Sequence, residues 1–151
     1  MVIAIIGESC TGKSTLAKQI REQIGGEIYT GKDYLRLAKS EGIAQKLFQK
    51  KLQEAVAGEN IIYVISETEH LSLLPEKAVR ILVTAELEQI KSRFAQRMHG
   101  NLPAPVATML ERKHGCFDGI VHDIHVISGE TKIEDVYHQL SSLTLSVSSG
   151  D

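Results

Sequence analysis

The sequence predicts an α/β fold in which helices cover a five-stranded parallel sheet in three layers. Its 151 residues are 42% hydrophobic and 24% charged, which is the composition of a globular domain with a substantial core. Short apolar runs alternate with longer stretches of helical periodicity, as expected for strands that are buried between helices. These five runs are residues 2–6, 27–29, 61–65, 79–83 and 125–127.

The stretch after the first apolar run is predicted to form an amphipathic helix. Leu16, Ile20 and Ile24 recur at every fourth position, so they lie on one helical face that we expect to be buried. Gly25 and Gly26 follow directly and are typical of a helix end.

A second helix is predicted between the second and third apolar runs. Ile43 with Leu47, and Leu52 with Val56, repeat at the same spacing and are expected to face the core. Gly58 ends this helix.

The rest of the chain predicts two further helical stretches and a tail. Residues 88–100 have helical periodicity, and the proline-containing loop 101–105 interrupts it. Another helix is expected over 132–140. We therefore expect one domain over residues 1–142 and a loose serine-rich tail over 143–151, whose alternating apolar residues would also suit a short edge strand.

The strongest motif lies between the first predicted strand and the first predicted helix. Residues 7–14 match the pattern G-x-x-x-x-G-K-[ST]. Two glycines let the backbone amides point inward, and the helix that follows adds the partial positive charge of its N-terminus. Lys13 would contact the terminal phosphates of a nucleotide, and the Ser14 hydroxyl would bind Mg²⁺. The alternative is an ordinary glycine-rich turn. The predicted phosphate-binding residues are Gly7, Glu8, Ser9, Cys10, Thr11, Gly12, Lys13, Ser14 and the adjoining Thr15.

Positive charge is concentrated between residues 91 and 114. This stretch carries a local charge of +4 in a chain of net charge −2. Arg93 and Arg97 are four residues apart and share a helical face, so they can reach one ligand together. With Arg112 and a mobile flap around residues 98–115, they would neutralise a transferring phosphoryl group and exclude water. The alternative for each arginine is a solvated surface position.

The motifs resemble those of the nucleoside monophosphate kinases, most closely the adenylate and cytidylate kinases, over residues 1–140. Residues 30–36 resemble the Thr-Gly-Asp-x-Leu-Arg segment of adenylate kinases, with one extra residue. This resemblance implies that Thr30 and Arg36 hold an acceptor monophosphate. Arg93, Phe94 and Arg97 resemble the residues at the start of the lid, which implies contacts with the adenine ring and the transferring phosphate.

The end of the chain carries a second part of this resemblance. Residues 117–129, followed by a helix, look like the closing strand and helix of guanylate and cytidylate kinases. The loop 128–131, which includes Gly129, would then border the donor base. We expect the strand order 2-3-1-4-5, with the nucleotide at the carboxyl ends of the strands.

The segment after the third strand departs from this family. Residues 66–70 read Ser-Glu-Thr-Glu-His, where these kinases carry an acidic residue and an arginine-containing element. Glu67 is the candidate for the magnesium carboxylate, although an exposed loop glutamate explains it about as well. Asp33 is a second acidic candidate, either near Mg²⁺ or as a proton acceptor, unless it caps a helix. The missing arginine leaves the identity of the acceptor open.

Several other function classes are disfavoured. A net charge of −2 gives no general attraction to nucleic acid polymers, and no apolar run approaches the ~20 residues of a membrane span. Guanine-reading and transporter-ATPase signatures are absent from the sequence. With two cysteines, a reduced compartment and a cytoplasmic location are expected, and the oligomeric state is left open.

Together these features predict ATP- and Mg²⁺-dependent phosphoryl transfer to a small acceptor, with a nucleoside monophosphate as the first choice. The acceptor would bind near helices over about residues 30–58. A kinase for a nucleoside or another metabolite, and a regulatory module that binds ATP without catalysis, are the alternatives.

Overall fold

The computed structural model describes residues 1–149 and contains one parallel sheet of five strands in the order β2-β3-β1-β4-β5. This arrangement confirms the predicted α/β fold and strand order. The strands are β1 (Val2–Ile6), β2 (Glu27–Thr30), β3 (Ile61–Ile65), β4 (Val79–Thr84) and β5 (Ile124–Ile127).

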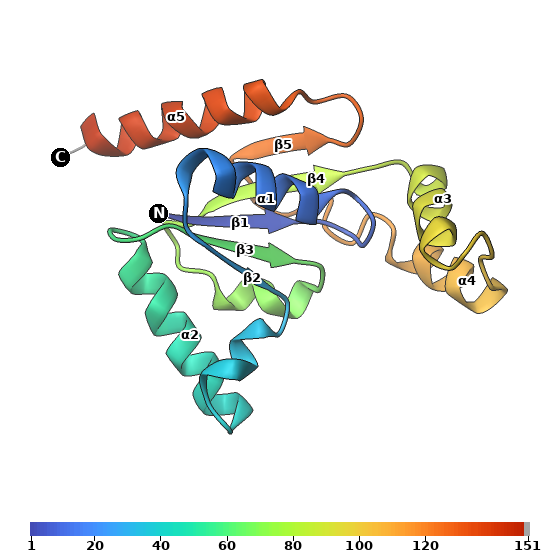
Figure 1. The fold of residues 1–151 in the computed structure, drawn as a ribbon, viewed down its shortest axis with the longest axis horizontal. Coiled ribbons are helices and arrows are strands. Elements are labelled where there is room, and N and C mark those ends of the chain that lie inside the picture. Colours follow the sequence, from blue (N-terminus) through green and yellow to red (C-terminus); the bar gives the residue numbers. More distant parts are fainter. Residues whose placement is uncertain (150–151) are drawn as a thin grey trace.

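Helices cover both faces of the sheet, and a helical pair extends past the carboxyl ends of its strands (Figure 1). Helices α1 and α5 lie on one face, while α2 and two short 3₁₀ helices lie on the other. Helices α3 and α4 form the extension, which we call the lid. The bounds are α1 (Lys13–Ile24), η1 (Asp33–Leu37), α2 (Glu41–Ala55), η2 (Thr68–Leu73), α3 (Leu87–Arg97), α4 (Ala104–Lys113) and α5 (Ile133–Ser149).

Strand β1 is the centre of the core because both of its faces are covered. It pairs in register with β3 from Val2 opposite Ile61 to Ile6 opposite Ile65, and with β4 on its other side. All five of its residues are buried, since alternate side chains enter the two apolar layers. The end of β1 is therefore held between two neighbouring strand ends.

The buried face of α2 differs from the predicted one. Ile43 and Leu47 are 56% and 44% exposed, so the expectation that they face the core is wrong. The helix is rotated so that Phe48 packs against Tyr29 and Tyr63, with ring centroids 4.9 and 4.8 Å apart. An aromatic side chain buries more apolar surface than an aliphatic one, so Phe48 decides which face turns inward. The buried residues of α2 are Ala44, Phe48, Leu52 and Ala55.

The ends of two other helices also depart from expectation. Ile24, the last residue of α1, is 37% exposed, whereas Leu16 and Ile20 are buried as predicted. Helix α5 continues to Ser149, so a loose tail or an edge strand over 143–149 is wrong. Its helical spacing extends past Leu140 to Leu143, which packs against the same apolar layer. Residues 150–151 of the predicted tail lie outside the described part of the chain.

Within residues 1–149, no helix has the length and apolar character needed to cross a membrane.

The rotation of α2 predicts that substitutions at two neighbouring residues change the free energy of unfolding by very different amounts. Phe48→Ala should lower the free energy of unfolding by roughly 3–5 kcal/mol, because it empties the space between two tyrosine rings. Leu47→Ala should change it by less than about 1 kcal/mol, because half of that side chain is already in water. Chemical denaturation of both variants measures the difference, and a larger loss for Leu47→Ala would contradict this orientation.

Candidate nucleotide-binding site

The loop between β1 and α1 forms a closed turn at the carboxyl edge of the sheet. Gly7 donates its amide to the Ile65 carbonyl at 3.1 Å, and a β-carbon at position 7 would lie only 2.4 Å from the Val83 carbonyl oxygen. This close approach requires glycine. Cys10 and Gly12 both have positive φ angles, of 64° and 95°, as the chain turns into the helix. The geometry is that expected of a loop whose amides surround an anion.

Lys13 is a buried cation inside this turn. Only 5% of its surface is exposed, and its ammonium donates to the Glu8 carbonyl, which also accepts a 2.8 Å hydrogen bond from the Thr11 hydroxyl. Desolvation lowers the pKa of Lys13 to about 8, and the positive charge of Arg97 acts in the same direction, while Cys10 and Glu8 act against it. Anionic groups that enter the loop would stabilise the charged form of this lysine.

A cleft of about 640 Å³ lies beside the loop. Arg93 and Arg97 of α3 line one wall, and the β5–α5 connection with Gly129 lines another. Arg93 also donates from Nη1 to the Cys10 carbonyl at 3.0 Å, which ties α3 to the loop. Thr15 borders the same cleft. The fold thus brings Cys10, Thr11 and Gly12 of the loop, both arginines and Gly129 together around one cleft.

The rest of the cleft lining is mixed. Its apolar part is formed by Leu16 of α1, by the strand residues Val83 and Val126, and by Ile133 and Val136 at the start of α5, and its polar part includes Gln19, Gln96, Ser128 and Thr131. A cleft with apolar walls and cationic arginines suits a planar base joined to phosphates.

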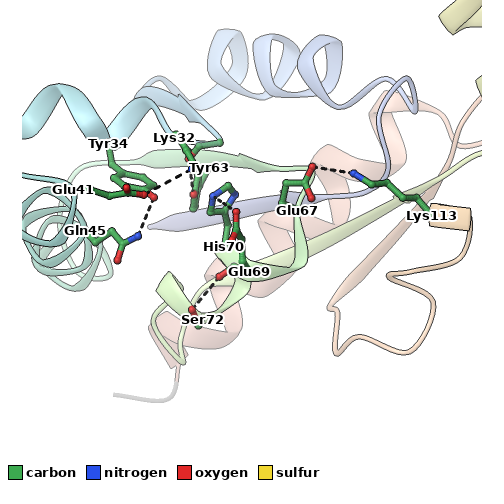
Figure 2. A network of polar contacts seen from close by, with 11 residues as sticks. Lys32, Tyr34, Glu41, Gln45, Tyr63, Glu67, Glu69, His70, Ser72 and Lys113 are labelled. Carbon is green, nitrogen blue, oxygen red and sulfur yellow. Dashed lines mark hydrogen bonds and ion pairs between the residues drawn. The ribbon is translucent and has the colours of Figure 1, made fainter. Parts of the chain in front are cut away.

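The lid is fastened to the sheet by polar contacts at its carboxyl end. The Glu8 carboxylate accepts the Gly115 amide at 3.1 Å, and its other oxygen lies 3.0 Å from His114 Nδ1. Lys113 forms an ion pair with Glu67 at 3.3 Å (Figure 2). The loop and the end of β3 therefore hold the lid in place over the carboxyl edge.

Glu67, which follows β3, and Ser14, at the start of α1 after the loop, lie at the carboxyl edge of the sheet. Glu67 is exposed except for its ion pair with Lys113, and Ser14 is exposed in the first turn of α1. Ser9, within the loop, is exposed as well. Hydroxyl and carboxylate oxygens are ligands that suit Mg²⁺, which binds few protein groups and keeps waters and phosphate oxygens. Their role in metal binding remains a prediction.

The predicted acceptor residues have local partners. The Asp33 carboxylate accepts the Thr30 amide at 2.8 Å, so it closes the turn after β2. Arg36 lies 4.4 Å from the centre of the Tyr29 ring and 3.3 Å from the carboxylate of Glu27. Because Glu27 is the first residue of β2, Arg36 is turned toward the amino end of that strand.

Other residues took positions that the sequence did not indicate. Arg112, on α4, is exposed and does not line the cleft beside the loop. The pairing of Glu8 with His114 joins residues more than 100 positions apart, and no local pattern signals such a contact. The buried His70 on η2 was likewise not singled out.

Three solved structures illustrate what the fold is similar to. A gluconokinase from Sinorhizobium meliloti 1021 has a TM-score of 0.61 at 17% identity, covering 95% of this chain and 91% of that one. A sugar kinase from Janibacter sp. HTCC2649 has a TM-score of 0.61 at 17% identity, covering 95% and 93%. Shikimate kinase from Aquifex aeolicus vf5 has a TM-score of 0.52 at 17% identity and covers both chains completely.

No protein-family model matches the chain, and no curated protein sequence matches it. At the identities of these three structures, the similarity shows a shared α/β fold.

The desolvation of Lys13 predicts a pH-dependent stability. The unfolded lysine keeps its proton up to about pH 10.5, whereas the folded one loses it near pH 8, so folding becomes more favourable as the pH rises between these values. Lys13→Met should therefore raise the free energy of unfolding of the ligand-free protein at pH 7, with a smaller gain at pH 10. Denaturant titrations at both pH values measure this effect. Lys18→Met, at an exposed lysine of α1, is the control, and equal changes for Lys13→Met at both pH values would contradict the prediction.

Proposed function

We propose that the protein binds ATP with Mg²⁺ in the cleft and transfers the terminal phosphoryl group to a small acceptor. The observation that carries this proposal is that the turn holding the buried Lys13 borders, through Cys10, Thr11 and Gly12, the same cleft as Arg93 and Arg97. Cations next to a glycine-containing turn and the N-terminus of a helix form an environment for a polyphosphate. Phosphoryl transfer depends mainly on such charge neutralisation and on alignment of the reacting groups.

The donor would lie with its phosphates in the loop and its base between α3 and the β5–α5 connection. Arg93 is anchored to the Cys10 carbonyl, so its planar guanidinium is held at the side of the cleft where it can stack on a base. The apolar strand residues would contact the other parts of the base. Arg97 would contact the transferring phosphate.

Ser14 and Glu67 would hold Mg²⁺, directly or through water. The metal would supply positive charge that neutralises the charge developing on the phosphate oxygens. Since Lys113 pairs with Glu67 in the present arrangement, metal binding would have to compete with a contact that fastens the lid. Movement of the lid and binding of the metal are therefore coupled in this proposal.

The location of Arg36 bears on the identity of the acceptor. A nucleoside monophosphate would need this arginine to leave Tyr29 and Glu27 and turn toward the carboxyl edge. Its present partners instead support the alternative of a nucleoside or another small metabolite. The same pairing, together with that of Glu67, also favours a second candidate, a regulatory module that binds ATP without an acceptor.

Acceptor-dependent ADP formation separates these candidates. The purified protein with ATP and Mg²⁺ would be incubated with nucleoside monophosphates, nucleosides, and sugar or acid metabolites. We expect ADP to form faster than in the acceptor-free reaction with at least one compound of the panel. Binding of ATP without any acceptor-dependent turnover would support the regulatory module, and the absence of both heat and melting shift with ATP and Mg²⁺ would refute nucleotide binding.

Arg97 should affect turnover more than binding. Arg97→Ala should reduce the rate of acceptor-dependent turnover about a hundredfold, because it removes a positive charge that would lie beside the transferring phosphoryl group. The dissociation constant for ATP should change less. Arg21→Ala, at an exposed arginine in the last turn of α1, is the matched control and should leave both values unchanged. Unaltered turnover in Arg97→Ala would assign Arg97 to the solvated surface.

A further inference from the structure

A second, smaller cavity lies on the face of the sheet that carries α2. Its volume is about 90 Å³, and it opens between η1, the first turns of α2, and η2. Residues from the segment after β2 meet residues from the segment after β3 here, as Figure 2 shows. Polar side chains that line it are Lys32, Tyr34, Glu41, Gln45, Glu69, His70 and Ser72.

His70 is the unusual member of this group. It is 5% exposed, and within the described part of the chain neither ring nitrogen has a hydrogen-bond partner. The carboxylate of Glu69 lies 3.7 Å from Nε2, beyond hydrogen-bonding distance. A buried polar group without a partner is unfavourable, so such a group next to a cavity indicates a missing partner.

The imidazole ring is held in place by aromatic neighbours. The ring of Tyr34 meets it edge-on with centroids 6.2 Å apart, and the ring of Tyr63 lies at 6.3 Å on another side. Tyr63 in turn donates its hydroxyl to the Gly31 carbonyl at 2.8 Å, and burial raises the pKa of Tyr63, which keeps this donor protonated. His70 therefore lies in a rigid wall beside the cavity, and because each of its nitrogens has less than 1 Å² of accessible surface, a ligand would meet them only after a local shift of the lining.

The other polar groups of the cavity define what would fit. Lys32 is already paired with Glu41 at 3.8 Å. The Tyr34 oxygen accepts from Gln45 Nε2 at 3.1 Å, which leaves the tyrosine proton free to be donated. His70 aside, the charged lining residues Lys32, Glu41 and Glu69 sum to −1. A phosphate or carboxylate would meet net repulsion, whereas the cavity can both donate and accept hydrogen bonds.

Hydroxyl groups match this set of partners. Each hydroxyl donates one hydrogen bond and accepts others, and neutral imidazole offers one donor and one acceptor. A hydroxyl can donate to Glu69 or to the bare nitrogen of His70, and accept from the tyrosine or from the other nitrogen. The volume equals that of about three water molecules at ~30 Å³ each, so it takes one end of a molecule and excludes a nucleobase.

We propose that this cavity binds a hydroxyl-bearing end of the phosphoryl acceptor and that His70 is the residue that positions it. This inference rests on the proposed kinase function and narrows its acceptor to a small hydroxylated compound without a phosphate at that end. The location supports it, because both segments follow strands whose carboxyl ends adjoin β1 and its loop. The first of these segments lies within residues 30–58, where the acceptor is expected to bind.

Direct binding can be measured without turnover. In the full-length protein labelled with ¹⁵N-histidine, the ring nitrogens of His70 would be followed by NMR during titration with glycerol, erythritol and gluconate, and with butyrate and inorganic phosphate as probes that lack alcohol groups. We expect saturable shifts at millimolar concentration with at least one hydroxylated probe and none with butyrate or phosphate. His70→Gln identifies the signals, and the exposed His122 serves as the internal reference. Absence of any shift, or an equal shift with phosphate, would overturn the proposal.

Kinetics provide an independent readout. With the hydroxylated acceptor that gives the highest turnover, His70→Phe should raise the acceptor KM about tenfold or more and leave the KM for ATP unchanged, whereas His70→Gln, which keeps a donor and an acceptor, should recover part of the loss. The matched control is His122→Phe. A melting shift with ATP and Mg²⁺ shows that each variant folds.

The two proposals fail in different ways. Acceptor-dependent turnover with an unchanged acceptor KM in His70→Phe would refute the cavity and leave the kinase function standing. Saturable shifts of the His70 signals without acceptor-dependent ADP formation would refute the kinase function while retaining a hydroxyl-binding cavity.

Discussion

A buried lysine inside a turn of main-chain amides is the constraint on which this site depends. Lys13 is desolvated at the start of α1, and its pKa is lowered to about 8 while Arg97 adds a second positive charge nearby. Such an arrangement is unfavourable in the ligand-free protein and is relieved by anionic oxygen atoms. Burial of the lysine is possible because β1 is fully enclosed and delivers the loop between the ends of β3 and β4. The stable sheet thus holds a positive charge at the place where the polyphosphate of the proposed function would bind.

Around this loop, the two sides of the carboxyl edge have different chemistry. On the side of β4 and β5, arginines and apolar strand residues form a cleft of about 640 Å³. On the side of β2 and β3, a cavity of about 90 Å³ has a net negative lining and an unpartnered histidine. Two unlike surfaces beside one glycine-containing loop would suit the two unlike ligands of the proposed reaction, a charged donor and a more neutral acceptor. The lid joins the two sides, because it contacts both Glu8 of the loop and Glu67 at the end of β3.

Several groups that the proposed reaction would use are already paired with neighbouring residues. Glu8 is bound by the start of the α4–β5 connection, Glu67 by Lys113, and Arg36 by Glu27. The last two pairs are exposed to water, where ion pairs contribute little to stability and exchange readily. Breaking these two ion pairs to admit a metal ion or a substrate therefore requires little free energy. Glu8 is more enclosed, with 12% of its side chain exposed, and its contacts with the lid would resist opening more strongly.

Local sequence determined the strands, the strand order and the glycine-containing loop after β1, since these depend on apolar runs, glycine positions and a motif within eight adjacent residues. The placement of Arg93 and Gly129 beside that loop also followed from the order of the elements. Tertiary packing decided the rest. Phe48 turned Ile43 and Leu47 outward, a stacking contact drew Arg36 to the far end of β2, and the tyrosine rings enclosed His70 beside a cavity. Helical spacing and charge would also have allowed other placements of these side chains. Only contacts between residues distant in the chain gave the observed placements the lower free energy.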